Sequence, residues 1–311
     1  MSRPDFLKLV ERIVPRRVLV RASVQVLRAR MAVRSRMRRS EVGPGMPIVG
    51  IFEFGEDQDW RSRLIAAMVA LSHEASFSVD RFTWLMCVGF PPDAPDEVYA
   101  LSVQAAPLVQ LHMFADAGEL QSFAARYVPP ASLREAKRQK FPSVPEILSR
   151  PREFEGLLNR ATSARASGHV LVKQLGGAAI VLAVHATAIG SVISAIEPSP
   201  AYNGAVTLLV VDHPPDSVKN TRLGPLMARH MGFSLLDELA LLRFCDGYVG
   251  PANHYAIMAV DAGVRCLVSG MGASTSPAGG EVTYSGSLSL DVVPWLERQR
   301  AYPGTKSHSS P

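Results

Sequence analysis

The sequence lacks the short motifs that mark several common classes of enzyme. It has no G-x-x-x-x-G-K-[ST] phosphate-binding loop, no G-x-G-x-x-G behind a predicted strand, and no G-x-S-x-G nucleophile elbow. These absences remove support for ATP hydrolysis by a P-loop, for NAD binding of the Rossmann type, and for hydrolase chemistry with a serine nucleophile.

Cysteine is also scarce, with three residues in a chain of 311. Cys87, Cys245 and Cys266 lie far apart inside apolar segments, which excludes a disulfide framework and a zinc site built from cysteines. We interpret them as small core residues in a reducing compartment. The eight histidines show no H-x-x-x-H or H-x-H spacing, so we expect no metal. The charged N-terminus has no uninterrupted apolar core behind it, so we expect no signal peptide.

Acidic residues are nearly absent from the first forty positions. Residues 1–40 carry twelve Lys/Arg and two acids, a net charge of +10, whereas the remainder carries 21 basic and 26 acidic residues, a net charge of −5. The basic character therefore belongs to an arm. The mildly acidic body argues against a broad nucleic-acid surface, and we expect no nucleic-acid partner.

The basic arm, residues 1–40, has the periodicity of an amphipathic helix. Its apolar stripe, at steps of four, three and four residues, consists of Val20, Val24, Leu27 and Met31. Arginines occupy much of the rest, which suits the headgroup region of an anionic membrane. A helix packed on the body and an arm for nucleic acid are the alternatives. We favour the membrane, which would make the protein cytoplasmic and peripheral on the inner membrane face.

The length and the 47% hydrophobic content predict two domains with a sizeable core. After a Gly/Pro linker, residues 46–128 alternate between strands and helices, a pattern typical of a parallel sheet. The predicted strands are 48–54, 82–88 and 108–114, and the predicted helices are 57–71 and 117–127. Residues 129–167 contain several prolines and a charged run, and we interpret them as a connector with a helix over 153–166.

Residues 168–300 are predicted to form a second α/β domain, and the polar residues 301–311 a disordered tail. Within this domain, residues 174–196 contain no Asp, Glu, Lys or Arg and one histidine, His185, a length and polarity that could mark a transmembrane helix. We reject that interpretation because the pattern divides into a strand, a polar turn and a helix. The Gly/Ser/Thr-rich stretch 270–286 is predicted to be a loop, either near a ligand crevice or on the surface.

Polar residues follow several strands predicted in this domain. The strands are expected at 179–184, 206–211, 247–249 and 264–268, separated by helices or connections. The carboxyl ends of parallel strands border the ligand crevice of an open α/β sheet, so the residues there are candidates for ligand binding. They are His185, Asp212, His213 and the turn from Gly250 to His254.

The turn after Val249 is built from small residues and leads into a helix. Asn253 is a good N-cap for this helix, and Gly263 is predicted to end it. A helix N-terminus has unpaired N–H groups and the positive end of the helix dipole, and both attract phosphate. The turn therefore suits a diphosphate, to which protonated His254 would add a charged donor. An ordinary strand-to-helix turn is the alternative.

The order of these pieces carries a resemblance. A leucine-rich helix, an Asp-Gly-Tyr-Val-Gly strand, a small turn, an Ala-rich helix and Ala-Gly-Val before a last strand resemble the C-terminal domain of GT-B type glycosyltransferases, with heptosyltransferase-like and fucosyltransferase-like members nearest. The resemblance implies two Rossmann-like domains facing a cleft. It also implies a nucleotide-sugar diphosphate site formed by Gly250, Ala252, Asn253 and His254. Those families often have Ser-Gly or a similar pair where this chain has Ala252-Asn253.

Three carboxylates, Glu56, Asp57 and Asp59, follow the first predicted strand of the N-terminal domain, and Glu56 and Asp57 are the candidates for chemistry. In the glycosyltransferases that the chain resembles, a carboxylate of this domain commonly removes the proton of the acceptor hydroxyl. The resemblance gives that role to Glu56 or Asp57 if the first strand is central in its sheet, with helix capping and dipole compensation by Asp57 and Asp59 as the alternative.

The implied function is sugar transfer from a nucleotide sugar to an envelope or glycolipid acceptor at the membrane surface, with no further cofactor. The N-terminal domain is short for this class. A non-catalytic GT-B-like protein that binds a ligand or a partner at the membrane is therefore the alternative.

Overall fold

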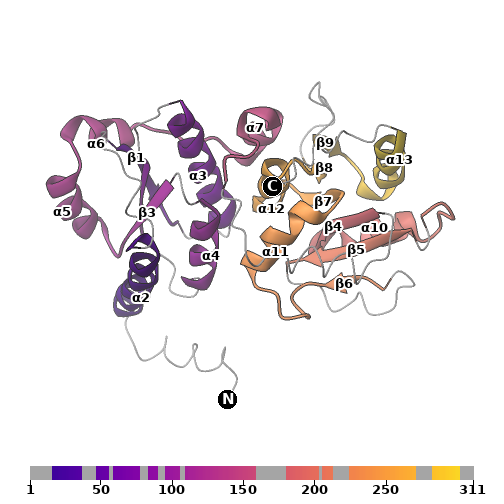
Figure 1. Cartoon of the computed structure of the whole chain (residues 1–311), viewed down its shortest axis with the longest axis horizontal. Coiled ribbons are helices and arrows are strands. Elements are labelled where there is room, and N and C mark those ends of the chain that lie inside the picture. Colours follow the sequence, from indigo (N-terminus) through magenta and orange to yellow (C-terminus); the bar gives the residue numbers. More distant parts are fainter. Residues whose placement is uncertain are drawn as a thin grey trace, which may run out of the picture. The chain divides into compact units, whose positions relative to one another are not determined.

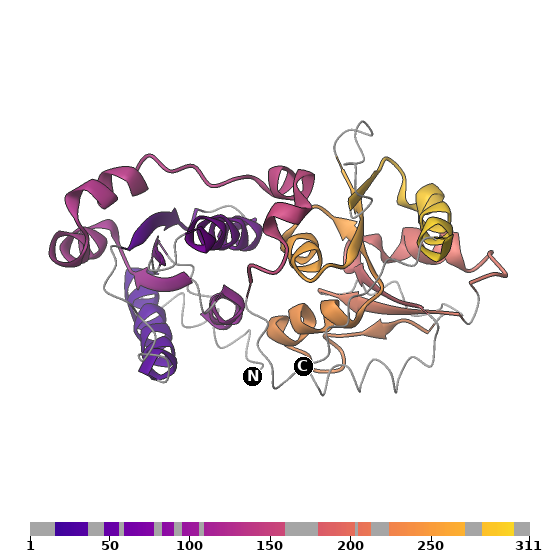
Figure 2. The same cartoon turned by 45° about the horizontal axis from the view of Figure 1, so that its top comes forward.

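The computed structural model describes residues 16–36, 47–55, 59–77, 83–89, 95–105, 109–158, 180–202, 205–212, 224–270 and 282–301. The chain forms two compact units, which Figure 1 and Figure 2 show from two directions. Unit 1 comprises Met1–Ile147 and Gly156–Ala161, and unit 2 comprises Leu148–Glu155 and Thr162–Pro311.

Unit 1 is built on a parallel three-stranded sheet in the order β1-β2-β3. The strands β1 (Ile48–Glu53), β2 (Thr83–Val88) and β3 (Val109–Phe114) agree with the predicted strands to within one residue at each end. Parallel strands need crossover connections, and these contain α3 (Trp60–Ser76) and α4 (Pro95–Ala105). The next helix, α5 (Ala117–Tyr127), has its predicted bounds. It begins there because the Asp116 carboxylate accepts the Glu119 N–H at 2.9 Å.

The described part of the basic arm is helix α2 (Arg16–Arg36), which packs against α4 and β3 within unit 1. Val24 and Leu27 of the predicted stripe are 0% exposed. Arg28 fixes the helix in place, because its Nε donates to the Met113 carbonyl at 2.7 Å and its guanidinium pairs with Glu119 at 2.6 Å.

This packing corrects the prediction that the stripe of the arm faces lipid. For Val24 and Leu27 the alternative interpretation, a helix packed on the body, is what the structure has. The side chains of Val20 and Met31 lie outside the described residues. The sequence could not decide between a helix on the membrane and a helix packed on the body, because a lipid surface and a protein core select the same apolar spacing.

We expect Leu27→Ala to lower the free energy of unfolding of unit 1 by about 2–5 kcal/mol, because it leaves a cavity beneath α2. Val26→Ala is the matched control, since Val26 is the neighbouring residue and is half exposed. It should change this free energy by less than about 0.5 kcal/mol. Urea unfolding followed by circular dichroism measures both variants. Equal midpoints would contradict the packing of α2 into the core of unit 1.

The described residues of the predicted connector, 129–158, contain three short helices, α6 (Pro130–Ala136), α7 (Val144–Ser149) and α8 (Pro151–Phe154). The first of them, α6, packs against β1. The helix predicted over 153–166 is wrong at its start, because α8 ends at Phe154 and the backbone of Glu155 is extended. Residues 159–166 lie outside the described part of the chain.

Unit 2 contains a parallel six-stranded sheet in the order β6-β5-β4-β7-β8-β9. Its strands are β4 (Ile180–His185), β5 (Val206–Val211), β6 (Leu226–Met227), β7 (Gly247–Pro251), β8 (Arg265–Ser269) and β9 (Val282–Ser285). Numbered along the chain within this sheet, the order is 3-2-1-4-5-6, that of a Rossmann fold. The predicted fold class, α/β with Rossmann-like parallel sheets, is confirmed.

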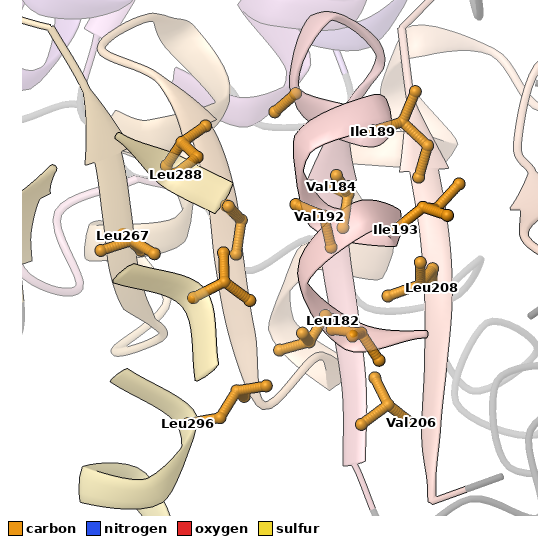
Figure 3. Close-up of a cluster of buried hydrophobic side chains, with 14 of the residues drawn as sticks. Leu182, Val184, Ile189, Val192, Ile193, Val206, Leu208, Leu267, Leu288 and Leu296 are labelled. Carbon is orange, nitrogen blue, oxygen red and sulfur yellow. The ribbon is translucent and has the colours of Figure 1, made fainter. Parts of the chain in front are cut away.

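Helices cover both faces of this sheet. On one face, α10 (Ile189–Ile196) and α13 (Leu288–Ala301) pack together over alternate residues of β4, β5, β7 and β8 (Figure 3). On the other face lies α12 (His254–Asp261), since Cys266, which points away from the Leu267 side of β8, approaches the Ala256 carbonyl at 3.9 Å. Trp295 of α13 requires glycine at the start of β7, because a Cβ on Gly247 would come within 2.5 Å of its ring.

The interpretation of residues 174–196 as strand, turn and helix is confirmed in its described part, where β4, the 3-10 turn η2 (Ala186–Ala188) and α10 follow one another. Among the described residues, no helix has both the length and the apolar character needed to cross a bilayer. Strands β6 and β9 and helix α13 are not predicted from the sequence. Strand β9 lies inside the stretch predicted as a loop, and its four residues are too short for a periodic signal.

Candidate functional site

The carboxyl ends of β4, β5 and β7 are neighbours in the sheet of unit 2, at the point where the strand order reverses. Open α/β sheets bind their ligands at this position, because connections leave adjacent strands in opposite directions there. Three residues predicted as candidates, His185, Asp212 and Gly250, lie at these three strand ends. The topology therefore brings together residues that are far apart in the sequence.

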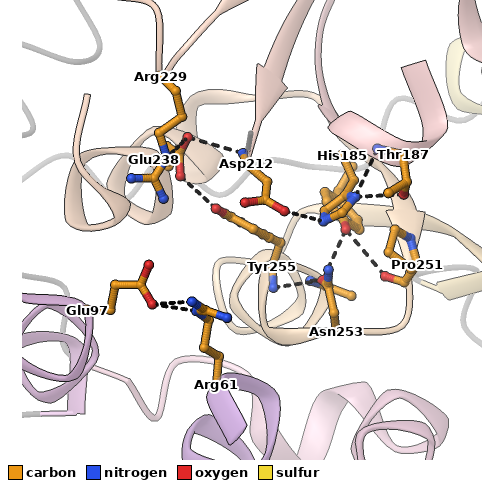
Figure 4. A network of polar contacts seen from close by, with 12 residues as sticks. Arg61, Glu97, His185, Thr187, Asp212, Arg229, Glu238, Pro251, Asn253 and Tyr255 are labelled. Carbon is orange, nitrogen blue, oxygen red and sulfur yellow. Dashed lines mark hydrogen bonds and ion pairs between the residues drawn. The ribbon is translucent and has the colours of Figure 1, made fainter. Parts of the chain in front are cut away.

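His185 and Asp212 form a pair across the ends of β4 and β5 (Figure 4). The His185 Nε2 lies 3.3 Å from the Asp212 Oδ2. The His185 Nδ1 accepts the Thr187 N–H at 3.3 Å and lies 2.8 Å from the Thr187 Oγ1, so Nε2 is the ring nitrogen that faces the carboxylate. The His185 side chain is 7% exposed and that of Asp212 is 39% exposed. The pair thus presents a carboxylate to solvent and keeps the imidazole behind it.

The backbone of Asp212 is in the left-handed region, with φ 71°, and it is the one non-glycine residue with positive φ in the part of the chain that the structure describes. This conformation costs about 1–2 kcal/mol in an L-residue. The Asp212 N–H offsets part of that cost by donating to Oε1 of Glu238 at 3.2 Å. Glu238 therefore fixes the direction in which the Asp212 side chain leaves the sheet.

Glu238 itself is fully buried on α11 (Leu235–Leu241) and is surrounded by polar partners (Figure 4). The Tyr255 hydroxyl donates to its Oε2 at 2.6 Å, and the Arg229 Nε forms an ion pair with its Oε1 at 2.9 Å. Burial raises the pKa of Glu238, while the Tyr255 hydrogen bond and the Arg229 charge oppose that shift. Burial also raises the pKa of the Tyr255 phenol, with the Glu238 charge adding to it.

Glu238, Arg229 and Tyr255 are not among the site residues predicted from the sequence. One signal for Glu238 was present: it lies three residues after Leu235 and four before Leu242, which places it on the apolar face of the predicted helix. An acid on that face must be paired when the helix is buried. Arg229 gave no such signal, because it follows the short strand β6, which the periodicity did not reveal.

Gly250 is required by close packing at the end of β7. A Cβ at this position would come within 2.6 Å of the His185 Cβ and 2.5 Å of the Tyr248 hydroxyl. That hydroxyl approaches the Pro251 carbonyl at 3.3 Å and the Asn253 Oδ1 at 3.2 Å. Glycine at position 250 therefore allows β7 and β4 to bring the turn and His185 together.

Asn253 is the N-cap of α12, as predicted, and this corrects the expectation that the first N–H groups of the helix are free. Its Oδ1 accepts the N–H of Tyr255 at 3.0 Å and that of Ala256 at 3.4 Å. The Ile257 N–H donates to the Asn253 carbonyl at 3.1 Å. A side chain that caps a helix occupies the donors that an anion would use. Any phosphate at this turn must use the N–H groups that precede Tyr255.

Two of the other predicted site residues are placed by the structure, and three lie outside its described part. The His254 side chain is buried, with its ring 4.3 Å from that of Tyr255, and Ala252 is half buried. His213, Glu56 and Asp57 lie outside the described residues. Within the described residues, no group of three or more His, Cys, Asp or Glu side chains could hold a metal ion.

No protein-family model matches this chain, and no curated protein sequence matches it. Among solved structures, the chain is similar to the crystal structure of the glycosyl transferase family 9 from Veillonella parvula DSM 2008. The TM-score is 0.52 at 9% sequence identity, and the match covers 81% of this chain and 96% of that chain. The N-terminal domain of Candida albicans trehalose-6-phosphate phosphatase matches with a TM-score of 0.34 at 10% identity, covering 83% of this chain and 90% of that chain, a similarity too low to carry an argument.

The similarity to the glycosyl transferase extends over most of both chains, and at this identity it shows the fold alone. The chain therefore has a GT-B-like glycosyltransferase fold at the level of its architecture. The resemblance seen in residues 235–270 therefore agrees with the structure at the level of the fold.

Proposed function

We propose that the protein is a glycosyltransferase whose nucleotide-sugar donor binds to unit 2 at the carboxyl ends of β4, β5 and β7. The observation that carries the proposal is the 3-2-1-4-5-6 strand order, which puts the His185–Asp212 pair and the turn at Gly250 at the switch point of the sheet. The fold similarity to a glycosyl transferase supports the same class.

In this proposal the turn at Gly250 and the His185–Asp212 pair have separate roles. The N–H groups of the turn that precede Tyr255, together with the positive end of α12, bind the donor diphosphate. The exposed Asp212 carboxylate accepts hydrogen bonds from donor hydroxyl groups, and His185 holds it in place. His185, His213 and His254 remain candidates for binding phosphate or sugar hydroxyls.

The chemical step of the proposal uses a carboxylate of unit 1. Glu56 or Asp57 takes the proton of the acceptor hydroxyl while its oxygen attacks the anomeric carbon of the sugar. The bond from that carbon to the diphosphate breaks, and the nucleoside diphosphate leaves with the electron pair. We propose an envelope component or a glycolipid as acceptor, at the inner face of the membrane.

Ala252→Glu tests the donor site, because it puts a carboxylate where the diphosphate is proposed to lie. We expect it to weaken binding of the donor by more than about tenfold, the value of one or more charge-assisted hydrogen bonds. Leu290→Glu, which adds the same charge at an exposed position of α13, is the control and should leave affinity unchanged. Calorimetric titration with UDP-, GDP-, ADP- and CMP-sugars measures both.

Unchanged affinity of folded Ala252→Glu for a donor that the parent protein binds would remove the turn from the site. A second function is favoured by the Asn253 cap, which occupies two N–H groups that a diphosphate would use. That function is a non-catalytic GT-B-like protein that binds a ligand or partner at the membrane. Clear donor binding without transfer to any acceptor fraction would support it.

A further inference from the structure

The side of α2 that faces away from unit 1 carries apolar residues as well. Val18 and Val26 are 53% and 52% exposed, and they lie eight residues apart, on the same side of the helix. Ala22 lies between them and is also exposed, as is Ala29 one turn further. We call these four residues the outer strip of α2. It is the side opposite to the buried Val24 and Leu27.

Arginines border the outer strip on both sides. Arg21 and Arg30 are exposed, and each pairs with a carboxylate of unit 1, Asp116 and Asp96 respectively. Such surface ion pairs contribute little stability, so the guanidinium groups can exchange a carboxylate for another anion at small cost. In all, α2 contains seven arginines and no acidic residue.

We propose that the outer strip of α2 is the surface by which the protein lies on an anionic membrane. Val18, Ala22, Val26 and Ala29 enter the boundary between headgroups and acyl chains, and the bordering arginines bind lipid phosphates. This surface deepens the proposed function, on whose membrane acceptor it rests, and it is the reverse of the side predicted from the sequence.

The combination of apolar and basic groups selects the membrane over other anionic partners. A nucleic acid would satisfy the arginines and leave the valines in water. An anionic bilayer offers both phosphates and an apolar layer. The net charge of +10 on residues 1–40, against −5 on the rest, directs this attraction to the arm.

Co-sedimentation of the full-length protein with vesicles tests the proposal. The vesicles contain phosphatidylcholine with phosphatidylglycerol, or phosphatidylcholine alone. We expect binding to the anionic vesicles only. Val18→Ser/Val26→Ser should weaken it roughly tenfold, because both apolar side chains lose their contact with lipid. The control Leu290→Ser, at an exposed position of unit 2, should bind like the parent protein.

Three outcomes would overturn the proposal: no binding of the parent protein to anionic vesicles, full binding of Val18→Ser/Val26→Ser, or binding of an RNA oligonucleotide in place of the vesicles. Thermal melting of the double variant serves as the folding check, since both positions are exposed. Donor titration runs in parallel and involves none of these residues. A failure of the donor site and a failure of the membrane surface are therefore distinguishable.

Discussion

Arg229→Met is expected to lower the free energy of unfolding of unit 2 by about 3–5 kcal/mol. Arg229 supplies the positive charge beside Glu238, which is fully buried (Figure 4). Without it, the partners that remain to the carboxylate among the described residues are the Tyr255 hydroxyl and the Asp212 N–H. A buried anion without a counterion is far more costly than the pair.

The loss should depend on pH in a direction that identifies its cause. Removal of Arg229 raises the pKa of Glu238 further above its value in the unfolded chain, about 4.3. An acid whose pKa is raised by folding destabilises the folded state increasingly as the pH rises above its unfolded pKa, and the loss is full once the pH exceeds the folded pKa. It should shrink as the pH falls towards the unfolded value. A loss from the missing side-chain packing would not change in this way.

Trp295 permits the measurement on unit 2 alone. It is the one tryptophan of unit 2 and is buried, while Trp60 and Trp84 belong to unit 1. Urea unfolding followed by fluorescence in a Trp60→Phe/Trp84→Phe background therefore reports on unit 2. Arg150→Met, at an exposed ion pair, is the control and should cost less than about 1 kcal/mol.

A rescue variant separates charge from packing. Glu238→Gln in the Arg229→Met background removes the buried charge and keeps an acceptor for the Tyr255 hydroxyl. Most of the lost stability should return. If the double variant is as unstable as Arg229→Met, the ion pair is not the reason for the loss.

Glu56→Gln or Asp57→Asn is expected to reduce the rate of sugar transfer by about a hundredfold or more, with donor affinity unchanged. A positioned general base contributes about 10²–10⁴ in rate, and the amide variants cannot take up the proton of the acceptor hydroxyl. Only the residue that acts as the base should show the full loss. The other should have a small effect, as expected of a carboxylate near a helix N-terminus.

The assay compares transfer from a labelled donor with calorimetric affinity for the same donor. Glu74→Gln is the control, because Glu74 is an exposed carboxylate on α3 and its contact with Gln139 survives in the amide. Full activity in both Glu56→Gln and Asp57→Asn would exclude this loop from the mechanism. Loss of donor affinity together with rate would point to binding instead of proton transfer.

The proposed donor site and the buried ion pair of unit 2 are linked through Glu238, so donor affinity and the free energy of unfolding should change together. Glu238 accepts the N–H of Asp212 and thereby holds a strained backbone at the end of β5. Variants that disturb Glu238 should therefore also misdirect the Asp212 carboxylate. Donor affinity measured on Arg229→Met, under conditions in which the variant remains folded, would detect this coupling.

The sequence by itself determined the fold class and most of the strands of both units. Period-two and period-3.6 patterns located β1, β2, β3 and α5 to within a residue, and the Asn253 cap fixed the start of α12. These features depend on local preferences and burial, which a single segment already contains. The same patterns predicted His185 and Asp212 as site candidates, because this prediction requires only the residue at the carboxyl end of each strand.

Only the tertiary structure decided which side of α2 is buried, which strands are neighbours, and which polar groups are paired. Periodicity shows that a helix has an apolar side and does not show what covers it, so Val24 and Leu27 were assigned to lipid although they pack in unit 1. The pairing of Arg229 with Glu238, the left-handed backbone of Asp212 and the contact of Gly250 with His185 join segments far apart in the chain. Such contacts follow from strand order and close packing, which no local pattern encodes.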